Sequence, residues 1–371
     1  MDFAFSPEQE ELRRTVRQFL DKAAPEAEVR RAMATEQGYD PDTWRRMAAD
    51  LGLLGIAIPE EYGGAGAGFT ELGLVAQEMG RALLGGPFLA TAVLAAAALL
   101  AAGDVDARER WLPPIAGGGL IATVALAPDG GPADVVARGP AADGTWRVAG
   151  SAEFVLDGHL AGLIVVPAGP PGRESLFAVA ADAAGLTRTL LPAFDLTRRY
   201  ARLEFAATPA TLIGPAGGAG PALARVFHLG CVALACEQVG VAERALDMAR
   251  DYALLRTQFG RPIGSFQAVK HKLASVLLEV EAARSAAWYG LWAADARPAE
   301  LPAVASIAQA TCSAAAYLAT SENIQVHGGI GYTWEHSAHL YFRRATTARM
   351  WLGDPASHYE RLAGQLGSGR P

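Results

Sequence analysis

Apolar positions near the start of the chain recur every three or four residues, the spacing of one face of an α-helix. The first such face follows Ser6-Pro7-Glu8-Gln9, which reads as an N-cap, a proline at the first helical position and the glutamine of a capping box. A second helix is predicted to begin at Asp40-Pro41, with Gly52 at its C-terminal end. With the Ala- and Leu-rich segments that follow, residues 1–120 are predicted to form an N-terminal helical domain.

The pattern changes after Pro113-Pro114, where short β-prone runs separated by turn residues replace the helical repeat. Asp143-Gly144 lies between the runs Val135–Arg138 and Thr145–Val148, which predicts a β-hairpin. Further strands are predicted at Leu163–Val166, Ser175–Val179 and Tyr200–Phe205. We therefore expect a central antiparallel β domain over residues 121–215.

Helical periodicity returns after the glycine-rich segment 214–221, which has the composition of a flexible hinge. Four helices are predicted, at Ala222–Arg256, Phe266–Ala296, Pro302–His327 and His336–Trp351. Long helices joined by short connections pack as an antiparallel bundle. The sequence thus predicts an α+β multidomain protein in which residues 216–371 form a C-terminal four-helix bundle.

Composition narrows the functional classes. The 371 residues carry a net charge of −7 without a basic block, so nucleic-acid binding is not expected. No positive segment precedes an apolar stretch at the N-terminus, and the Ala-rich run Leu83–Gly103 favours a buried helix over a membrane span. The three cysteines show no paired spacing, and Cys231 and Cys236 are expected in the core. These features predict a cytoplasmic enzyme.

Candidate chemistry lies in the segments Pro59–Gly64, Tyr252–Gln267 and Gln325–Tyr332. Arg256 ends a predicted helix, where its guanidinium suits the macrodipole and is also able to grip a pyrophosphate. Phe259 offers an aromatic face suited to an adenine. A helix-capping arginine and a core phenylalanine are the alternatives. His336 and His339 share a predicted helix face without a carboxylate or cysteine cluster, so no metal site is predicted.

Together and in this order, the three segments closely resemble the signatures of the acyl-CoA dehydrogenase family. The resemblance implies that fold, FAD as cofactor, and oxidation of an acyl-CoA thioester to its enoyl form. It further implies contacts to the ADP half of an FAD that is bound mainly by a neighbouring subunit, and hence an oligomer. The residues implied in these contacts are Arg256, Gln258, Phe259, Gln267, Gln325 and Gly329.

The chain departs from the family at the catalytic base, a carboxylate that removes a proton from the carbon next to the thioester. The two positions where the family carries this base correspond to Leu352 and to about Gly230, and neither side chain accepts a proton. Glu237, two helical turns after Gly230, is a substitute base, the structural partner of a buried arginine, or an exposed side chain. Asp354 is a second candidate base, and its alternative is the N-cap of a helix beginning at Pro355.

The flavin-ring end departs as well. The family's Thr-Glu-Pro and Trp-Ile-Thr segments read Leu126-Ala127-Pro128 and Phe154-Val155-Leu156, so polar contacts have become apolar while the ADP-end motif is intact. The leading hypothesis is an FAD-dependent acyl-CoA dehydrogenase, or a subunit of one, in a homo-oligomer or hetero-oligomer. The alternatives are a non-catalytic partner subunit of a heteromeric acyl-CoA dehydrogenase, and a flavin monooxygenase or acyl-CoA oxidase on the same fold.

Overall fold

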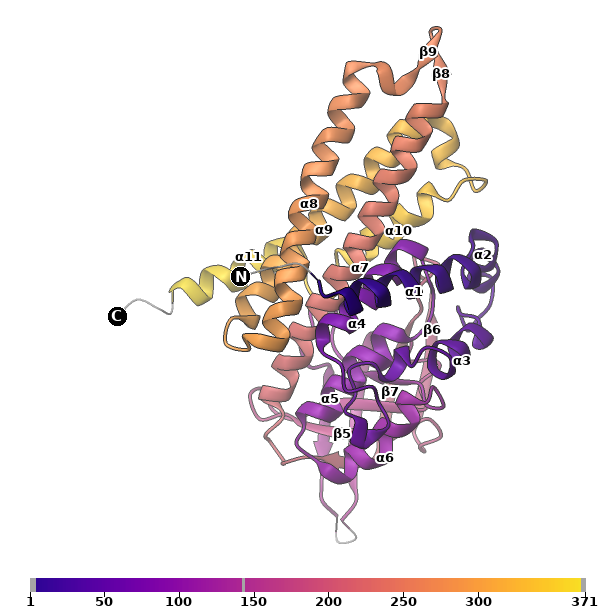
Figure 1. Ribbon diagram of the computed structural model, residues 1–371. Helices are drawn as coiled ribbons and strands as arrows, with labels where there is room; N and C mark the ends of the chain where they lie inside the picture. The colour runs from indigo at the N-terminus through magenta and orange to yellow at the C-terminus, as the bar shows by residue number, and fades with distance from the viewer. Residues whose placement is uncertain (1–4, 142–143, 368–371) are drawn as a thin grey trace.

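The computed structural model describes residues 5–141 and 144–367, which run from helices through a sheet to helices again (Figure 1). The Ser6 capping box is confirmed: the Gln9 amide donates to Ser6 Oγ at 3.2 Å, and the Ser6 amide donates to Gln9 Oε1 at 2.9 Å. The Asp40 carboxylate caps the third helix in the same way. The N-terminal helices are α1 (Pro7–Ala23), α2 (Glu26–Met33), α3 (Pro41–Ala49), α4 (Phe69–Ala82), α5 (Ala96–Ala101) and α6 (Val105–Ala116).

The apolar run 83–103 lies inside the protein, as predicted, but it is not one regular helix. A π-helical segment at Leu89–Ala95 leads into α5, and all seven of its residues are buried. The residues before it are not helical, because Leu83 adopts a φ of 52° and the Gly85-Gly86-Pro87 turn follows. Two later helices, α7 (Gly220–Leu255) and α9 (Leu301–His327), are long and apolar enough to cross a membrane, yet most of their apolar stretches are buried as core helices.

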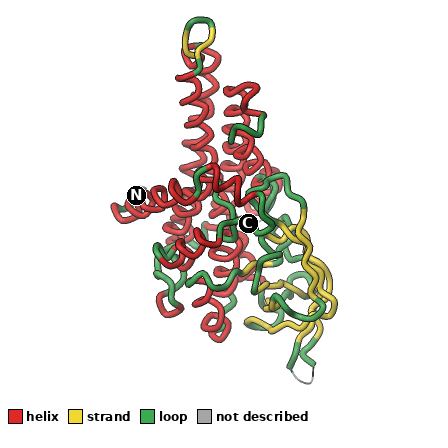
Figure 2. Tube along the Cα trace, turned by 90° about the vertical axis from the view of Figure 1, so that its right-hand side faces the viewer, coloured by secondary structure: helices red, strands yellow, loops and turns green. Residues whose placement is uncertain are grey.

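The central segment forms one seven-stranded sheet on one side of the helices (Figure 2). Its strands are β1 (Ala122–Val124), β2 (Asp134–Arg138), β3 (Trp146–Leu156), β4 (Leu163–Ala168), β5 (Ser175–Ala180), β6 (Leu186–Leu191) and β7 (Tyr200–Ile213). The order is β1-β4-β5-β7-β3-β2, and β6 also pairs with β7.

The predicted β2–β3 hairpin is confirmed, with Arg138 opposite Arg147; Gly144 of its turn is described, whereas Asp143 lies outside the described residues. Among the described strand pairs, the antiparallel expectation is wrong for one. β1 and β4 run parallel, because the chain crosses over through the β2–β3 hairpin before returning beside β1.

The C-terminal helices are α7 (Gly220–Leu255), α8 (Gln267–Ala296), α9 (Leu301–His327), α10 (Ala338–Ala348) and α11 (Pro355–Gly367). The first three follow the predicted helices to within two residues. α10 is shorter than predicted, since turns occupy residues 333–337 and 349–352. Between α7 and α8, the two-residue strands β8 (Thr257–Gln258) and β9 (Arg261–Pro262) form a small hairpin at the far end of the bundle (Figure 1).

Helices α4 and α7 touch backbone to backbone. A Cβ atom placed on Gly240 would lie 1.9 Å from the carbonyl oxygen of Gln77, and one on Gly80 would lie 2.0 Å from that of Glu237. Only glycine permits this approach. The crossing fixes the height and rotation of α7 at Glu237, the residue on which the candidate site depends.

We predict that Gly240→Ala lowers the free energy of unfolding by about 1–3 kcal/mol, because the new methyl group overpacks the crossing. Gly364→Ala in α11 is the matched control, since a Cβ there meets no atom within 4 Å and alanine stabilises an exposed helix by about 0.5–1 kcal/mol. Urea unfolding measures both. Equal stabilisation by the two substitutions would contradict the described packing.

Candidate functional site

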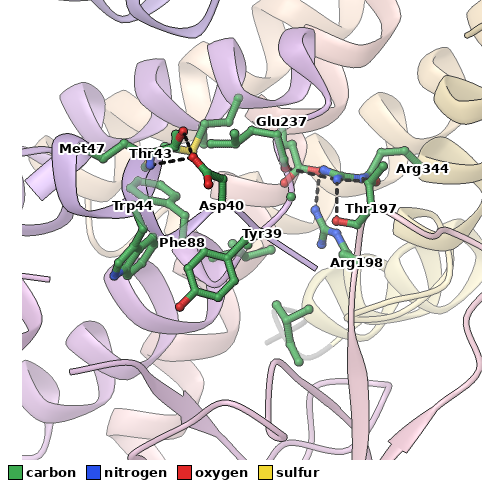
Figure 3. Close-up of a pocket in the computed structure, with 17 residues that line it drawn as sticks. Tyr39, Asp40, Thr43, Trp44, Met47, Phe88, Thr197, Arg198, Glu237 and Arg344 are labelled. Carbon is green, nitrogen blue, oxygen red and sulfur yellow. Dashed lines mark hydrogen bonds and ion pairs between the residues drawn. The ribbon is translucent and has the colours of Figure 1, made fainter. Parts of the chain in front are cut away.

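Glu237 is buried on α7, with 7% of its surface exposed, and is held between two arginines (Figure 3). Its Oε1 accepts hydrogen bonds from Arg344 Nη1 at 2.9 Å and from Arg198 Nη2. Burial alone would raise the pKa of this carboxyl group, but the two guanidinium charges outweigh it and hold the pKa below its usual value. Glu237 is therefore ionised and paired through Oε1 with two cations.

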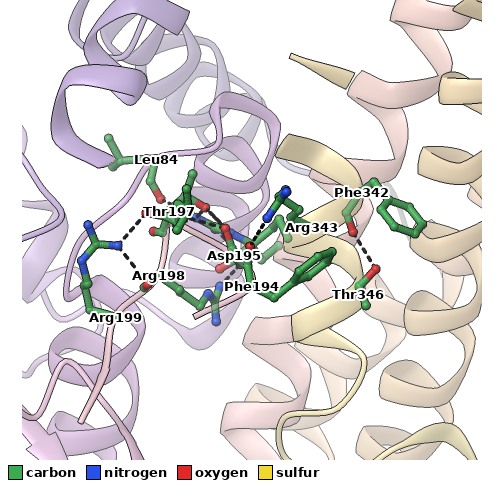
Figure 4. A network of polar contacts seen from close by, with 12 residues as sticks. Leu84, Phe194, Asp195, Thr197, Arg198, Arg199, Phe342, Arg343 and Thr346 are labelled. Atoms are coloured by element: carbon green, nitrogen blue, oxygen red, sulfur yellow. Dashed lines mark hydrogen bonds and ion pairs between the residues drawn. The ribbon is translucent and has the colours of Figure 1, made fainter. Parts of the chain in front are cut away.

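Arg344 comes from α10 and uses all three of its nitrogens. Besides Glu237, it binds Asp195 Oδ2 at 2.8 Å, the carbonyl oxygen of Thr197 at 3.2 Å and that of Leu84 at 3.3 Å. Asp195 and Thr197 lie in the connection between β6 and β7, which runs past α10 (Figure 4). The charge cluster thus joins the sheet to α7 and α10.

The same connection is anchored on both sides. Arg343 of α10 donates to the carbonyl oxygen of Phe194 at 2.9 Å (Figure 4). Arg199 donates to the carbonyl oxygens of Met33 and Thr35 at 2.7 Å each, at the C-terminal end of α2. The segment from Phe194 to Arg199 is therefore held by all three parts of the chain.

For Glu237, the structure favours the interpretation as partner of a buried arginine over that as catalytic base. A general base works best when its pKa lies near the operating pH, and two arginines move this pKa in the opposite direction. Asp354 behaves as an N-cap: its Oδ1 accepts from the Ser357 amide at 2.8 Å, and this hydrogen bond lowers the pKa of the carboxyl group. Neither carboxylate has the environment of a base.

The two positions where the resemblance puts the base lie side by side. A Cβ on Gly230 would be 3.0 Å from Leu352 Cδ1 and 2.8 Å from Leu94 Cδ2. Leu352 is fully buried, with a φ of 62°, and its amide donates to the carbonyl oxygen of Pro128 at 2.8 Å. The space in front of the base position is thus filled by leucine side chains and closed to solvent.

A groove of about 410 Å³ lies where the resemblance puts the flavin ring. It is lined by Pro128, Phe154, Pro192, Ala193, Phe194, Tyr200, Thr346, Thr347, Met350 and Trp351. The Thr346 hydroxyl already donates to the carbonyl oxygen of Phe342, and the Ala127 amide donates to the carbonyl oxygen of Gly131. The groove has the size and apolar walls for part of a ring system, but it offers few polar partners for the edge of a flavin, one of them the buried Tyr200 hydroxyl, which has no hydrogen-bond partner.

The ADP-end residues lie together at the far end of the bundle. Arg256, Gln258 and Phe259 sit at the β8–β9 hairpin, and Tyr252 beside them stacks on His327 of α9 with ring centroids 4.3 Å apart. The contact brings the Gln325–Gly329 segment to the same end. Phe259 is 92% exposed and has a φ of 54°, a left-handed conformation that is uncommon for a bulky residue.

Gln267, Gln325 and Gly329 are also exposed, so the protein itself covers none of this set. A cation, amides and an aromatic face presented outward suit a ligand carried by another chain. The donor set therefore fits the ADP half of FAD in trans, while the ring end of this chain fits poorly.

Three members of the charge cluster could not be singled out from the sequence. Arg198 and Arg344 reach Glu237 from 39 and 107 residues away along the chain, so no local spacing relates them. Asp157, at the end of β3, is 3% exposed, and burial raises its pKa to about 7 against the opposing effect of three nearby arginines. The only local signal is the run Asp195–Arg199, a charged stretch next to an apolar strand.

Comparisons with known proteins agree with this geometry. Residues 6–119 match the acyl-CoA dehydrogenase N-terminal domain, and residues 217–367 match the acyl-CoA dehydrogenase C-terminal domain. The chain is 36% identical to acyl-CoA dehydrogenase IpdE2 of Mycobacterium tuberculosis over 97% of each protein.

Two solved structures are also similar. The ChsE4-ChsE5 complex from Mycobacterium tuberculosis has a TM-score of 0.92 at 29% identity and covers all of both chains. The Tcur3481-Tcur3483 steroid ACAD, a G363A variant, has a TM-score of 0.89 at 32% identity and covers 98% of each chain.

We predict that Glu237→Gln destabilises the fold by about 3–5 kcal/mol, because it leaves the buried Arg198 without its carboxylate and Arg344 with Asp195 alone. Glu153→Gln is the control: it breaks the pair with Arg202, in which both side chains are about half exposed, and should cost less than about 1 kcal/mol. Denaturant unfolding compares them. Equal losses would show that the buried cluster is not the structural anchor described.

The stability of the protein is also expected to depend on pH through Asp157. Because the pKa of Asp157 is raised on folding, its contribution is present below its unfolded-state pKa and is lost as pH rises through about 7. Asp157→Asn, which keeps a residue tolerated at the φ of 53°, should therefore gain stability over the wild type between pH 5 and pH 8, by at most about 4 kcal/mol. A stability difference that stays flat over this interval would refute the titration.

Proposed function

The chain belongs to the acyl-CoA dehydrogenase family, whose cofactor is FAD, and we propose that it works as one subunit of a heteromeric member of that family. In this role it completes the flavin site of a related subunit, which holds the flavin ring and the catalytic base. The observation that carries the proposal is the contrast between the closed base position at Leu352 and the open ADP end at Arg256.

The reaction needs a carboxylate in front of the carbon that loses its proton, while the flavin accepts the hydride. At the base position of this chain, Gly230 and Leu352 supply only hydrocarbon, and Leu94 fills the remaining space. Among the residues that the structure describes, the two nearest candidates in sequence have other roles: Glu237 pairs with two arginines, and Asp354 caps α11. Proton abstraction is therefore assigned to the partner.

The flavin-ring end supports the same division. The groove next to Pro128 and Phe154 is apolar, and the Thr346 hydroxyl and the Ala127 amide are already bonded within the chain. The buried Tyr200 hydroxyl is one lining group without such a partner. Each hydrogen bond that a buried ring edge fails to make costs about 1 kcal/mol or more. A few such losses reduce affinity by orders of magnitude, so this chain alone is expected to hold FAD weakly.

At the other end, the guanidinium of Arg256 is free to form a charge-assisted hydrogen bond with a pyrophosphate that a second subunit presents. Phe259, almost wholly exposed, supplies a face for the adenine. Two similar structures are described as pairs, ChsE4-ChsE5 and Tcur3481-Tcur3483, which supports an assembly of unlike subunits. The substrate in this proposal is an acyl-CoA, and we place the assembly in the cytoplasm.

The test begins with the lone chain, for which we predict substoichiometric FAD and poor reduction by a panel of acyl-CoAs that includes a steroid side-chain thioester. Co-expression with a family member that carries the base should restore both. One FAD per lone chain, rapidly reduced by an acyl-CoA, would instead make this protein a self-sufficient dehydrogenase with a relocated base.

In the assembly, Arg256→Ala should weaken FAD binding by about tenfold to a hundredfold, because a charge-assisted contact is worth about 1.5–3 kcal/mol. Arg250→Ala is the matched control: it lies under two turns earlier on α7 and pairs with Asp247 and Asp251. Fluorescence of released FAD measures both variants. Equal affinities for FAD in the two variants would refute the contact in trans.

A further inference from the structure

A small chamber lies between α3 and the charge cluster, apart from both the flavin-ring groove and the ADP end (Figure 3). Its volume is about 30 Å³, and Arg198 and Glu237 form its polar wall. A cavity needs roughly 10–15 Å³ by this measure to hold one water molecule, so the chamber has room for about two small polar groups. Its partly exposed residues, Tyr39, Asp40 and Gly86, mark the mouth.

Arg198 reaches this chamber with most of its hydrogen-bonding capacity unused. Only Nη2 is bonded, to Glu237, whereas the buried Nε and Nη1 have no partner. Arg344, its counterpart on the other side of Glu237, has all three nitrogens bonded. The side chain of Arg198 is only 7% exposed, so the two bare nitrogens are not satisfied by bulk solvent.

The rest of the chamber wall provides no acceptor that completes Arg198. The side chains of Met47, Ala76, Met79 and Phe88 contribute hydrocarbon. The Thr43 hydroxyl donates to Asp40 at 2.7 Å, within the cap of α3. An acceptor for Arg198 therefore has to enter from outside.

Charge decides what kind of acceptor fits. The buried cations Arg198 and Arg344 are balanced by Glu237 and Asp195, and the charge of Asp157 acts on Arg199 nearby. The rim carries Asp40; burial alone would raise the pKa of its carboxyl group, but hydrogen bonds from Thr43 and the charge of Arg31 lower it. A negatively charged ligand would meet this carboxylate on entry and would find no unbalanced cation inside.

We propose that the chamber is a binding site for the carbonyl oxygen of a neutral ligand, such as a keto group, which accepts hydrogen bonds from Arg198. The carbonyl group occupies the chamber, and the remainder of the ligand leaves through the mouth beside Tyr39 and Gly86. Binding of this ligand requires neither FAD nor a partner subunit, so the lone chain suffices for the test.

The test uses acetone, labelled with ¹³C at the carbonyl, and acetate as a charged probe of the same size. Saturation-transfer NMR measures binding to the lone chain, and infrared difference spectroscopy reads the carbonyl stretch. We expect acetone to bind saturably and more tightly than acetate, with a shift of the carbonyl stretch to lower wavenumber. No saturable acetone signal, which would mean water only, or tighter binding of acetate would overturn the proposal.

Two variants locate the site. Arg198→Lys keeps the charge beside Glu237 but removes the two unused nitrogens, and it should weaken acetone binding at least about tenfold. Arg202→Lys, at an exposed arginine two strand positions into β7, should bind like the wild type. Ala76→Val fills the chamber without touching a charge, so it tests the site even if Arg198→Lys fails to fold. Unchanged acetone binding by Ala76→Val would refute the location.

Discussion

One carboxylate bonded by two arginines determines much of this molecule. Glu237 is buried on α7, and its ion pairs with Arg198 and Arg344 join the β6–β7 connection to α10. A buried charge is tolerated only when it is paired. Removing one partner leaves the remaining charges buried without compensation for their lost hydration. The same pairing makes Glu237 a poor proton acceptor. A stable fold requires Glu237 to be ionised and paired, whereas a catalytic base requires a raised pKa. At this residue the environment meets the first requirement and not the second.

Many helix boundaries and one hairpin can be predicted from residues that are close together in the sequence. Capping at Ser6 and Asp40, the turn at Gly144 and the long apolar repeats of α7, α8 and α9 each depend on residues close together in the chain. The departures have both local and distant origins. Turns at residues 333–337 and 349–352 shorten α10, and β6 lacks a run of β-branched or aromatic residues. The direction of β1 is instead set by β4, its neighbour in the sheet but not in the chain.

The candidate site is less predictable because its geometry is tertiary. The apolar surroundings of Glu237 indicate that it needs a partner, yet nothing in the sequence identifies Arg198 or Arg344 as that partner. The contact between Gly230 and Leu352 likewise appears only in three dimensions. These two positions, each of which lacks a base, lie next to each other and enclose one apolar space. The ADP-end residues carry a sequence signature, but their exposure is visible only in the folded bundle.

These features describe a subunit in which one end of a shared cofactor site persists and the reacting end is sealed. The most direct measurement is the flavin content of the purified assembly, determined by absorbance and by the mass of the native complex. If this chain contributes only the contacts around Arg256 to a flavin bound by its partner, one FAD should be found for each pair of unlike chains. One FAD for every chain, including this one, would contradict the division of labour.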